Sequence, residues 1–109
     1  MRDGVNMANS IKIRSQRLDG ITEIKLLISH PMENGRNRDL NGELIPAHFI
    51  EQLVLKLNGQ VIFTCNLAGS VSKNPFFTIR SKTATTGDKI TASWTDNRQV
   101  SDSAEHVVS

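Results

Sequence analysis

Short runs in which apolar and polar residues alternate recur along the whole chain. Ile11 and Ile13 alternate with Lys12 and Arg14, which is the period of a half-buried β-strand. The same pattern recurs in residues 22–29, 49–57, 60–67, 76–83, 89–96 and 99–107. Because successive strand residues point to opposite faces of a sheet, these runs predict about seven short strands. No stretch has the period of a helix.

Turn residues separate these runs and favour antiparallel neighbours. Asp19-Gly20 follows the first run, and Asn58-Gly59 joins residues 49–57 to residues 60–67. Asn-Gly between apolar runs is a strong hairpin signal, because both residues tolerate positive φ. The pattern is typical of an all-β fold, an immunoglobulin-like antiparallel β-sandwich, with Trp94 as its core anchor. The chain has a single cysteine and no tyrosine, so it is not an antibody-type domain.

Length and charge narrow the function classes. The 109 residues are enough for one domain, which we expect over residues 10–109, with residues 1–9 as a disordered leader or as residues of non-native origin. Residues 1–10 are polar, so we expect no signal peptide there, and the apolar runs are too short to span a membrane. The net charge of +2 is spread along the chain, which argues against nucleic-acid binding.

A long polar stretch, residues 30–46, interrupts the alternation. It contains two prolines and several asparagines, with a turn signal at Asn41-Gly42 and a minor strand at Leu44 and Ile45. Loops of this length in compact domains are usually functional or disordered. We therefore take this loop as the exposed functional region.

The hairpin around Asn58-Gly59 carries apolar side chains on both faces. With a two-residue loop, Val54 faces Phe63 and Lys56 faces Val61 on the side opposite to the core. Such a face suggests docking to a partner, or self-association of the isolated chain. Alternatively, a β-bulge shifts the register, or the long loop covers this face.

Few residues offer chemistry of their own. None of the three histidines has a metal-site spacing, so we take each as a surface or loop residue. Cys65 lies within a strand beside Phe63 and Leu67, which predicts a small buried hydrophobe rather than a nucleophile. We predict no catalytic residue, no cofactor and no metal.

Five segments together resemble one family. Residues 28–35 read Ile-Ser-His-Pro-Met-Glu-Asn-Gly, similar to the ISHxMExG stretch of SoxZ proteins. A basic polar loop follows, and then residues 42–46, Gly-Glu-Leu-Ile-Pro. The Leu-Asn-Gly hairpin at residues 57–59, the VSxNPxF segment at residues 71–77 and the GxxxxxxWxD strand at residues 87–96 resemble the family in the same order. The resemblance spans nearly the whole chain, from about residue 10 to residue 107.

The resemblance implies a non-catalytic scaffold subunit that pairs with SoxY. SoxY is the protein whose C-terminal Gly-Gly-Cys-Gly-Gly segment carries sulfur intermediates. It implies transient contact with other Sox enzymes, and a periplasmic address reached by export with SoxY. We expect partner binding through the long loop and the hairpin. The expected contact residues are His30, Met32, Glu33, Arg36, Arg38, Val54, Val61 and Phe63.

Two other functions stay open. The first is a metal-binding or redox immunoglobulin-like periplasmic domain that uses His30, Met32 and His48. The second is a generic interaction module unrelated to sulfur.

Overall fold

Seven antiparallel strands form the domain, as the alternation predicts. The computed structural model describes residues 10–67 and 71–109, so the predicted leader at residues 1–9 lies outside the described residues. The strands are β1 (Ile11–Leu18), β2 (Ile21–Ile28), β3 (Ile50–Leu57), β4 (Gln60–Asn66), β5 (Phe76–Ser81), β6 (Lys89–Asp96) and β7 (Ser101–Val107). Among the described residues there is no helix long and apolar enough to cross a membrane.

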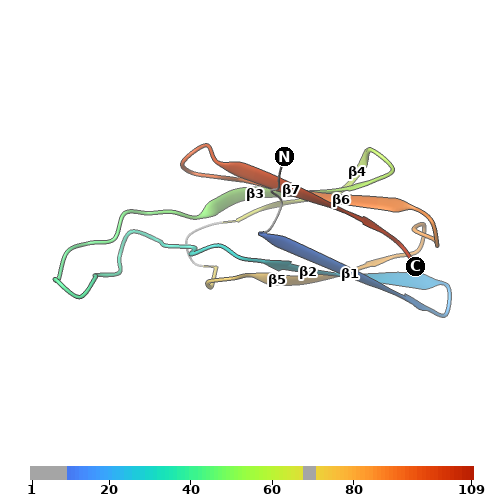
Figure 1. The fold of residues 1–109 in the computed structure, drawn as a ribbon, viewed down its shortest axis with the longest axis horizontal. Helices are drawn as coiled ribbons and strands as arrows, with labels where there is room; N and C mark the ends of the chain where they lie inside the picture. The colour runs from blue at the N-terminus through green and yellow to red at the C-terminus, as the bar shows by residue number, and fades with distance from the viewer. Residues whose placement is uncertain (1–9, 68–70) are drawn as a thin grey trace, which may run out of the picture.

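The strands form two layers (Figure 1). The first sheet has the order β1-β2-β5 and the second the order β4-β3-β6-β7, with every neighbouring pair antiparallel. This is the predicted all-β sandwich, consistent with an immunoglobulin-like fold. The turns fall at the predicted places, and Asn58 and Gly59 both have positive φ, 49° and 87°. That pair of angles is what a two-residue type I′ hairpin requires.

The core lies between the two sheets. One face of each inner strand is fully buried, as at Ile24 and Leu26 of β2 and Leu53 and Leu55 of β3. Trp94, the predicted core anchor, is 6% exposed, and its indole N–H donates to the Ser10 hydroxyl. Burial of these side chains is the main stabilising term of a domain this small.

One side of the sandwich is closed by polar contacts. β1 contacts β7 across the two sheets. The Ser15 hydroxyl lies 2.7 Å from Nε2 of His106, and Ser10 donates to the Asp102 carboxylate. These hydrogen bonds cover the core between β1 and β7.

The opposite side, at β4, is open as far as residues 10–67 and 71–109 show. β1 lies against β7, so the three-stranded sheet covers β7, β6 and β3. No described strand lies above the inner face of β4. Phe63 and Cys65 point inward beside Leu55 and Leu53, yet they are only half-buried whereas those leucines are fully buried. The open side therefore exposes part of the core.

A β-bulge corrects the expected register of the β3–β4 hairpin. Lys56 pairs with Val61 as predicted, but the register shifts between Leu55 and Lys56, so Phe63 pairs with Leu55 and not with Val54. Ile62 has no partner in this register. The bulge was one of the two alternatives left open, and it turns Phe63 toward the core.

The predicted loop between β2 and β3 is an ordered projection. Figure 1 shows it extending far from the sandwich, beyond the ends of the strands. The radius of gyration is 15.7 Å, against roughly 13 Å for a compact domain of this length. The projection accounts for the longest dimension of the molecule, 51 Å.

Candidate functional site

The projection, residues 33–48, is an irregular β-hairpin that we call the arm. At its base, Glu33 and His48 exchange two backbone hydrogen bonds of 2.7 and 2.8 Å. Farther out, Arg38 pairs with Leu44, so the predicted minor strand at residues 44–45 is reduced to a single bridge. Leu40, near the far end, is fully exposed.

Local sequence explains why the arm turns where it does. The Asp39 carboxylate accepts hydrogen bonds from the backbone N–H groups of Asn41 and Glu43, which is how Asp favours turns. Gly35 has φ +85°, a left-handed conformation that glycine adopts without the strain of a side chain.

Two asparagines hold the ends of the arm against the sandwich. The Asn74 side chain accepts from the backbone N–H of His30, and the backbone N–H of Asn74 donates to the His30 carbonyl, both at 3.0 Å. On the other end, Asn97 accepts from the N–H of Phe49 at 2.8 Å and donates to the Ala47 carbonyl at 2.9 Å. Both chain segments that enter the arm are therefore anchored.

A buried polar cluster lies beneath the arm. Nε2 of His30 and Nε2 of His48 both donate to Oδ2 of Asp96, at 3.2 and 2.8 Å. The other carboxylate oxygen of Asp96 accepts from the backbone N–H groups of Arg98 and Val100. We call His30, His48 and Asp96 the clamp, because it connects both ends of the arm to the end of β6.

The hydrogen bonds assign the protonation state of His30. The backbone N–H of Met32 donates to Nδ1 of His30 at 3.1 Å. Nδ1 is thus an acceptor and the proton sits on Nε2, which makes this ring neutral. Burial is the largest influence on this imidazole and holds its pKa below the ordinary value, although the Asp96 hydrogen bond opposes the shift.

The Asp96 carboxyl is charged despite its burial. Burial raises its pKa, but the hydrogen bonds from His30, Val100, His48 and Arg98 together outweigh that effect, and the pKa lies below its ordinary value. A buried carboxylate with four donors is a satisfied group rather than a reactive one.

The clamp is also the group of side chains that comes nearest to a metal site. The ligand atoms of His30, His48 and Asp96 all lie within 4.8 Å of one another. However, binding a metal through Nε2 of His30 would move its proton to Nδ1, where the N–H of Met32 already points. Two donors would then face each other, which opposes the metal-binding alternative. The Met32 sulfur is turned elsewhere and accepts from the N–H of Ile50 at 3.4 Å.

The expected contact residues fall into three groups. His30 and Met32 are buried, so they offer little surface and instead hold the base of the arm. Glu33 is half-buried at that base, whereas Arg36 and Arg38 are exposed along the arm. Residues Val54, Val61 and Phe63 lie on the β3–β4 hairpin, where Val61 is exposed and the other two are half-buried.

Sequence reasoning missed the clamp. His30 lies in the loop after β2, as one form of the expectation had it, but it is only 4% exposed and is therefore not a surface residue. The sequence predicts Asp96 as the last residue of the strand at residues 89–96, with no role of its own. A signal for its role was present, because position 96 continues the inward phase of Ile90, Ala92 and Trp94. A carboxylate at a core-facing position needs buried donors.

Cys65 faces the core together with Phe63 and Leu67, as predicted, but its side chain is half-buried rather than buried. It lies inside the regular part of β4.

Comparison with known protein families decides the family. The model of the family described as sulphur oxidation protein SoxZ matches residues 11–107. The chain belongs to the SoxZ family. This places it in the Sox system of sulfur oxidation, in a family of carrier-complex subunits rather than catalytic enzymes. No curated protein matches the chain. The residues matched by the family model include both the arm and the open side at β4.

Proposed function

We propose that the chain is the non-catalytic scaffold subunit of the SoxYZ carrier and that it binds SoxY through the open side of its sandwich. The observation that carries this proposal is the uncovered inner face of β4, where Phe63 and Cys65 are half-buried although they point into the core. An incompletely covered core is a surface that a second subunit stabilises by burying it.

The edge of β4 supports the same contact. An exposed edge strand normally carries charges or proline that prevent pairing with other chains. β4 reads Gln-Val-Ile-Phe-Thr-Cys-Asn and contains neither, and its Val61 and Ile62 are exposed. The edge strand β1, by contrast, carries Lys12, Arg14 and Arg17. The β4 edge is therefore the one suited to a permanent partner.

In this proposal the arm is a recognition element. It is anchored at both ends by Asn74 and Asn97 and presents Leu40 at its exposed end. A rigid projection loses little conformational freedom when it is bound, so it supports contact with SoxY or with the enzymes that act on the carrier.

Co-expression tests the proposal. The chain is produced with the SoxY of the same system, and the complex is isolated through a tag on SoxY. We expect a stable one-to-one heterodimer for the native chain and loss of pairing for Ile62→Lys, which places a charge on the β4 edge. Val107→Lys is the matched control, because Val107 is an exposed apolar residue on the other edge of the same sheet. Pairing that survives Ile62→Lys, or no pairing of the native chain, contradicts the proposal.

The non-catalytic role has its own test. Intact-mass measurement of the heterodimer after turnover with thiosulfate should show the sulfur adducts on SoxY. An adduct on Cys65 would contradict the scaffold role.

The proposed address is the periplasm, reached with SoxY, as the family resemblance implies. Fractionation of cells that do or do not produce SoxY tests it. Periplasmic recovery of the chain should require SoxY, and recovery without SoxY would contradict the shared export.

A further inference from the structure

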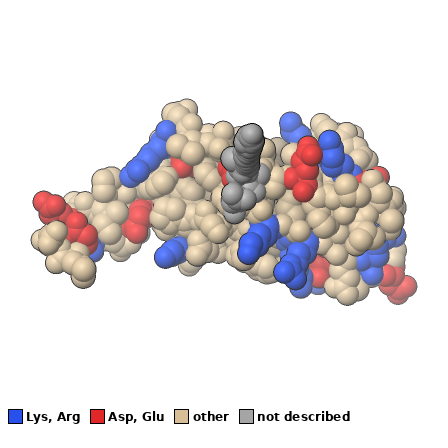
Figure 2. All heavy atoms as spheres, in the orientation of Figure 1, with Lys and Arg blue, Asp and Glu red and all other residues tan. Residues whose placement is uncertain are grey.

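The outer surface of the β1-β2-β5 sheet differs in chemistry from the rest of the molecule. Cross-strand pairing places Lys12 beside Leu27 and Phe76 in one row, and Arg14 beside Lys25 in the next. We call these five residues the basic face. Figure 2 shows Lys and Arg side chains along this layer of the sandwich, the lower one in the view.

Positive charge dominates this surface. Its carboxylate, Glu23, is already paired with Arg80 at 3.2 Å and lies 3.7 Å from Lys25. Within residues 10–67 and 71–109, neither Lys12 nor Arg14 takes part in an ion pair. Lys12 and Arg14 therefore lie on this surface with no described carboxylate to balance their charge.

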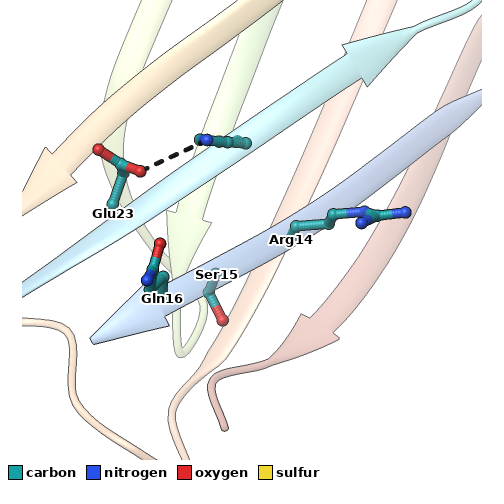
Figure 3. Close-up of a pocket in the computed structure, with 5 residues that line it drawn as sticks. Arg14, Ser15, Gln16 and Glu23 are labelled. Carbon is teal, nitrogen blue, oxygen red and sulfur yellow. Dashed lines mark ion pairs between the residues drawn. The ribbon is translucent and has the colours of Figure 1, made fainter. Parts of the chain in front are cut away.

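Two adjoining grooves cross the same surface. The first, about 300 Å³, lies between Arg14, Gln16, Glu23 and Lys25 (Figure 3). The second, about 220 Å³, extends from Arg14 and Lys25 to the apolar pair Leu27 and Phe76. Because Arg14 and Lys25 line both, a ligand that spans the grooves meets cations in the middle and apolar side chains at one end.

The apolar pair is the second mark of an interface. Leu27 is 40% exposed and Phe76 58% exposed, and the two are direct cross-strand partners. Aromatic residues and arginine are enriched at protein interfaces, where a polar rim surrounds an apolar centre, and Phe76 and Leu27 beside Arg14 fit that arrangement. The outer surface of the other sheet differs, since β6 presents Thr91, Ser93 and Thr95 there.

We propose that the basic face binds an acidic surface on an enzyme that acts on the carrier, and that an apolar side chain of that enzyme contacts Leu27 and Phe76. This inference rests on the proposed function. Nucleic acid is a poorer fit, because phosphates would leave the apolar pair unpaired, and a small anion would fill only part of the two grooves. Complementary charge mainly speeds encounter and orients the partner, which suits transient visits to several enzymes.

Salt-dependent binding of charge-reversal variants tests the inference. The SoxYZ heterodimer is titrated with each purified Sox enzyme of the same system, by calorimetry at several NaCl concentrations. The double variant Lys12→Glu/Arg14→Glu should bind at least one enzyme about tenfold more weakly at low salt, and the difference should shrink as salt screens the charges. Thr95→Glu is the control, because Thr95 is an exposed strand residue on the opposite sheet, away from both the basic face and the β4 edge.

A second pair of variants tests the apolar contact. Phe76→Ser should weaken binding of the same enzyme at all salt concentrations. Val107→Ser, which alters a residue with the same 58% exposure, should change the affinity by less than about twofold.

The outcomes separate this inference from the proposed function. Every variant of the basic face should still pair with SoxY in the co-expression assay, because the β4 edge is unchanged. Enzyme affinities that stay within about twofold for both the charge and the apolar variants overturn the inference alone. Loss of SoxY pairing in these variants also overturns it, because the basic face would then belong to the heterodimer contact.

Discussion

A single carboxylate, Asp96, holds together three parts of the chain. It accepts from His30 before the arm, from His48 at the end of the arm, and from the backbone after β6. All four donors lie at least partly inside the domain, so the loss of either carboxylate oxygen leaves two of them without a partner.

Asp96→Asn should therefore destabilise the chain strongly. The amide oxygen can still accept from Arg98 and Val100, but the amide nitrogen would face the N–H groups of His30 and His48. Each buried donor left unpaired costs roughly 1–3 kcal/mol. Urea unfolding followed by the fluorescence of Trp94, the single tryptophan, measures the change in the free energy of unfolding.

Asp39→Asn provides the control for that measurement. Asp39 also accepts two backbone hydrogen bonds, but it is exposed on the arm, where an asparagine oxygen serves as well. Its effect should be clearly smaller. Equal losses for the two variants would show that the clamp contributes nothing specific.

The pKa shifts of His30 and Asp96 predict how the free energy of unfolding depends on pH. The pKa of His30 in the native state lies below its ordinary value of 6.5. As pH falls below that value, the unfolded chain binds a proton that the native chain does not, so stability decreases as pH falls. The pKa of Asp96 is lowered as well, and below its ordinary value of 3.8 it adds a second loss of the same sign. The charged and titratable groups that act on the pKa of His30 are Asp96, His48 and Arg98.

Unfolding at about pH 8 and about pH 5 measures the first of these effects, and histidine side-chain NMR gives the cause. At neutral pH the His30 ring should carry its proton on Nε2 only. A native His30 that titrates at or above 6.5, or stability that increases on acidification in this range, contradicts the assignment.

At the scale of elements, the arm and the sandwich depend on different contacts. The arm beyond its base contacts chiefly itself, through the Arg38–Leu44 bridge and the Asp39 turn. Its base is held by Asn97 and the clamp. The outer arm therefore adds little to the stability of the domain.

Replacing residues 36–45 with Asn-Gly should change the free energy of unfolding by less than about 1 kcal/mol, because closing a shorter loop costs slightly less entropy. Asn97→Ala keeps the full arm but removes the hydrogen bonds to Phe49 and Ala47, and it should cost more. Denaturant unfolding of the two variants compares them. A larger loss from the truncation than from Asn97→Ala would show that the outer arm stabilises the sandwich.

The elements differ in how far the sequence predicts them. Alternation and turn residues predict all seven strands, because strand period and turn chemistry are local properties. The β3–β4 register was not predictable from the hairpin loop, since the bulge at Ile62 adds one residue and reverses the faces beyond it. The clamp joins residues far apart in sequence. The one sequence signal for it was that Asp96 occupies a core-facing position of its strand.

On the scale of the whole molecule, the sandwich is asymmetric. The β1–β7 side is sealed by side-chain hydrogen bonds, while the β4 side leaves core residues half-exposed beside an uncharged edge strand. The arm extends from one end, and the basic face covers the outside of the smaller sheet. In the function proposed above, permanent pairing and transient recognition would therefore use different surfaces of one domain.

This asymmetry predicts that the isolated chain self-associates. Without SoxY, the exposed Val61 and Ile62 and the unpaired backbone of β4 are free to meet the same edge of a second copy. Sedimentation velocity over a range of concentrations should show a reversible dimer. Ile62→Lys should shift it to monomer, and Val107→Lys should leave it unchanged.

Competition with SoxY identifies the surface that the dimer uses. If homodimer and heterodimer share the β4 edge, adding SoxY must dissociate the homodimer in proportion to the heterodimer formed, because one edge strand pairs with one partner at a time. A native chain that stays strictly monomeric at high concentration contradicts the prediction. A complex that contains both the homodimer contact and SoxY would show instead that self-association uses a different surface, and the open side at β4 would then have SoxY as its only partner.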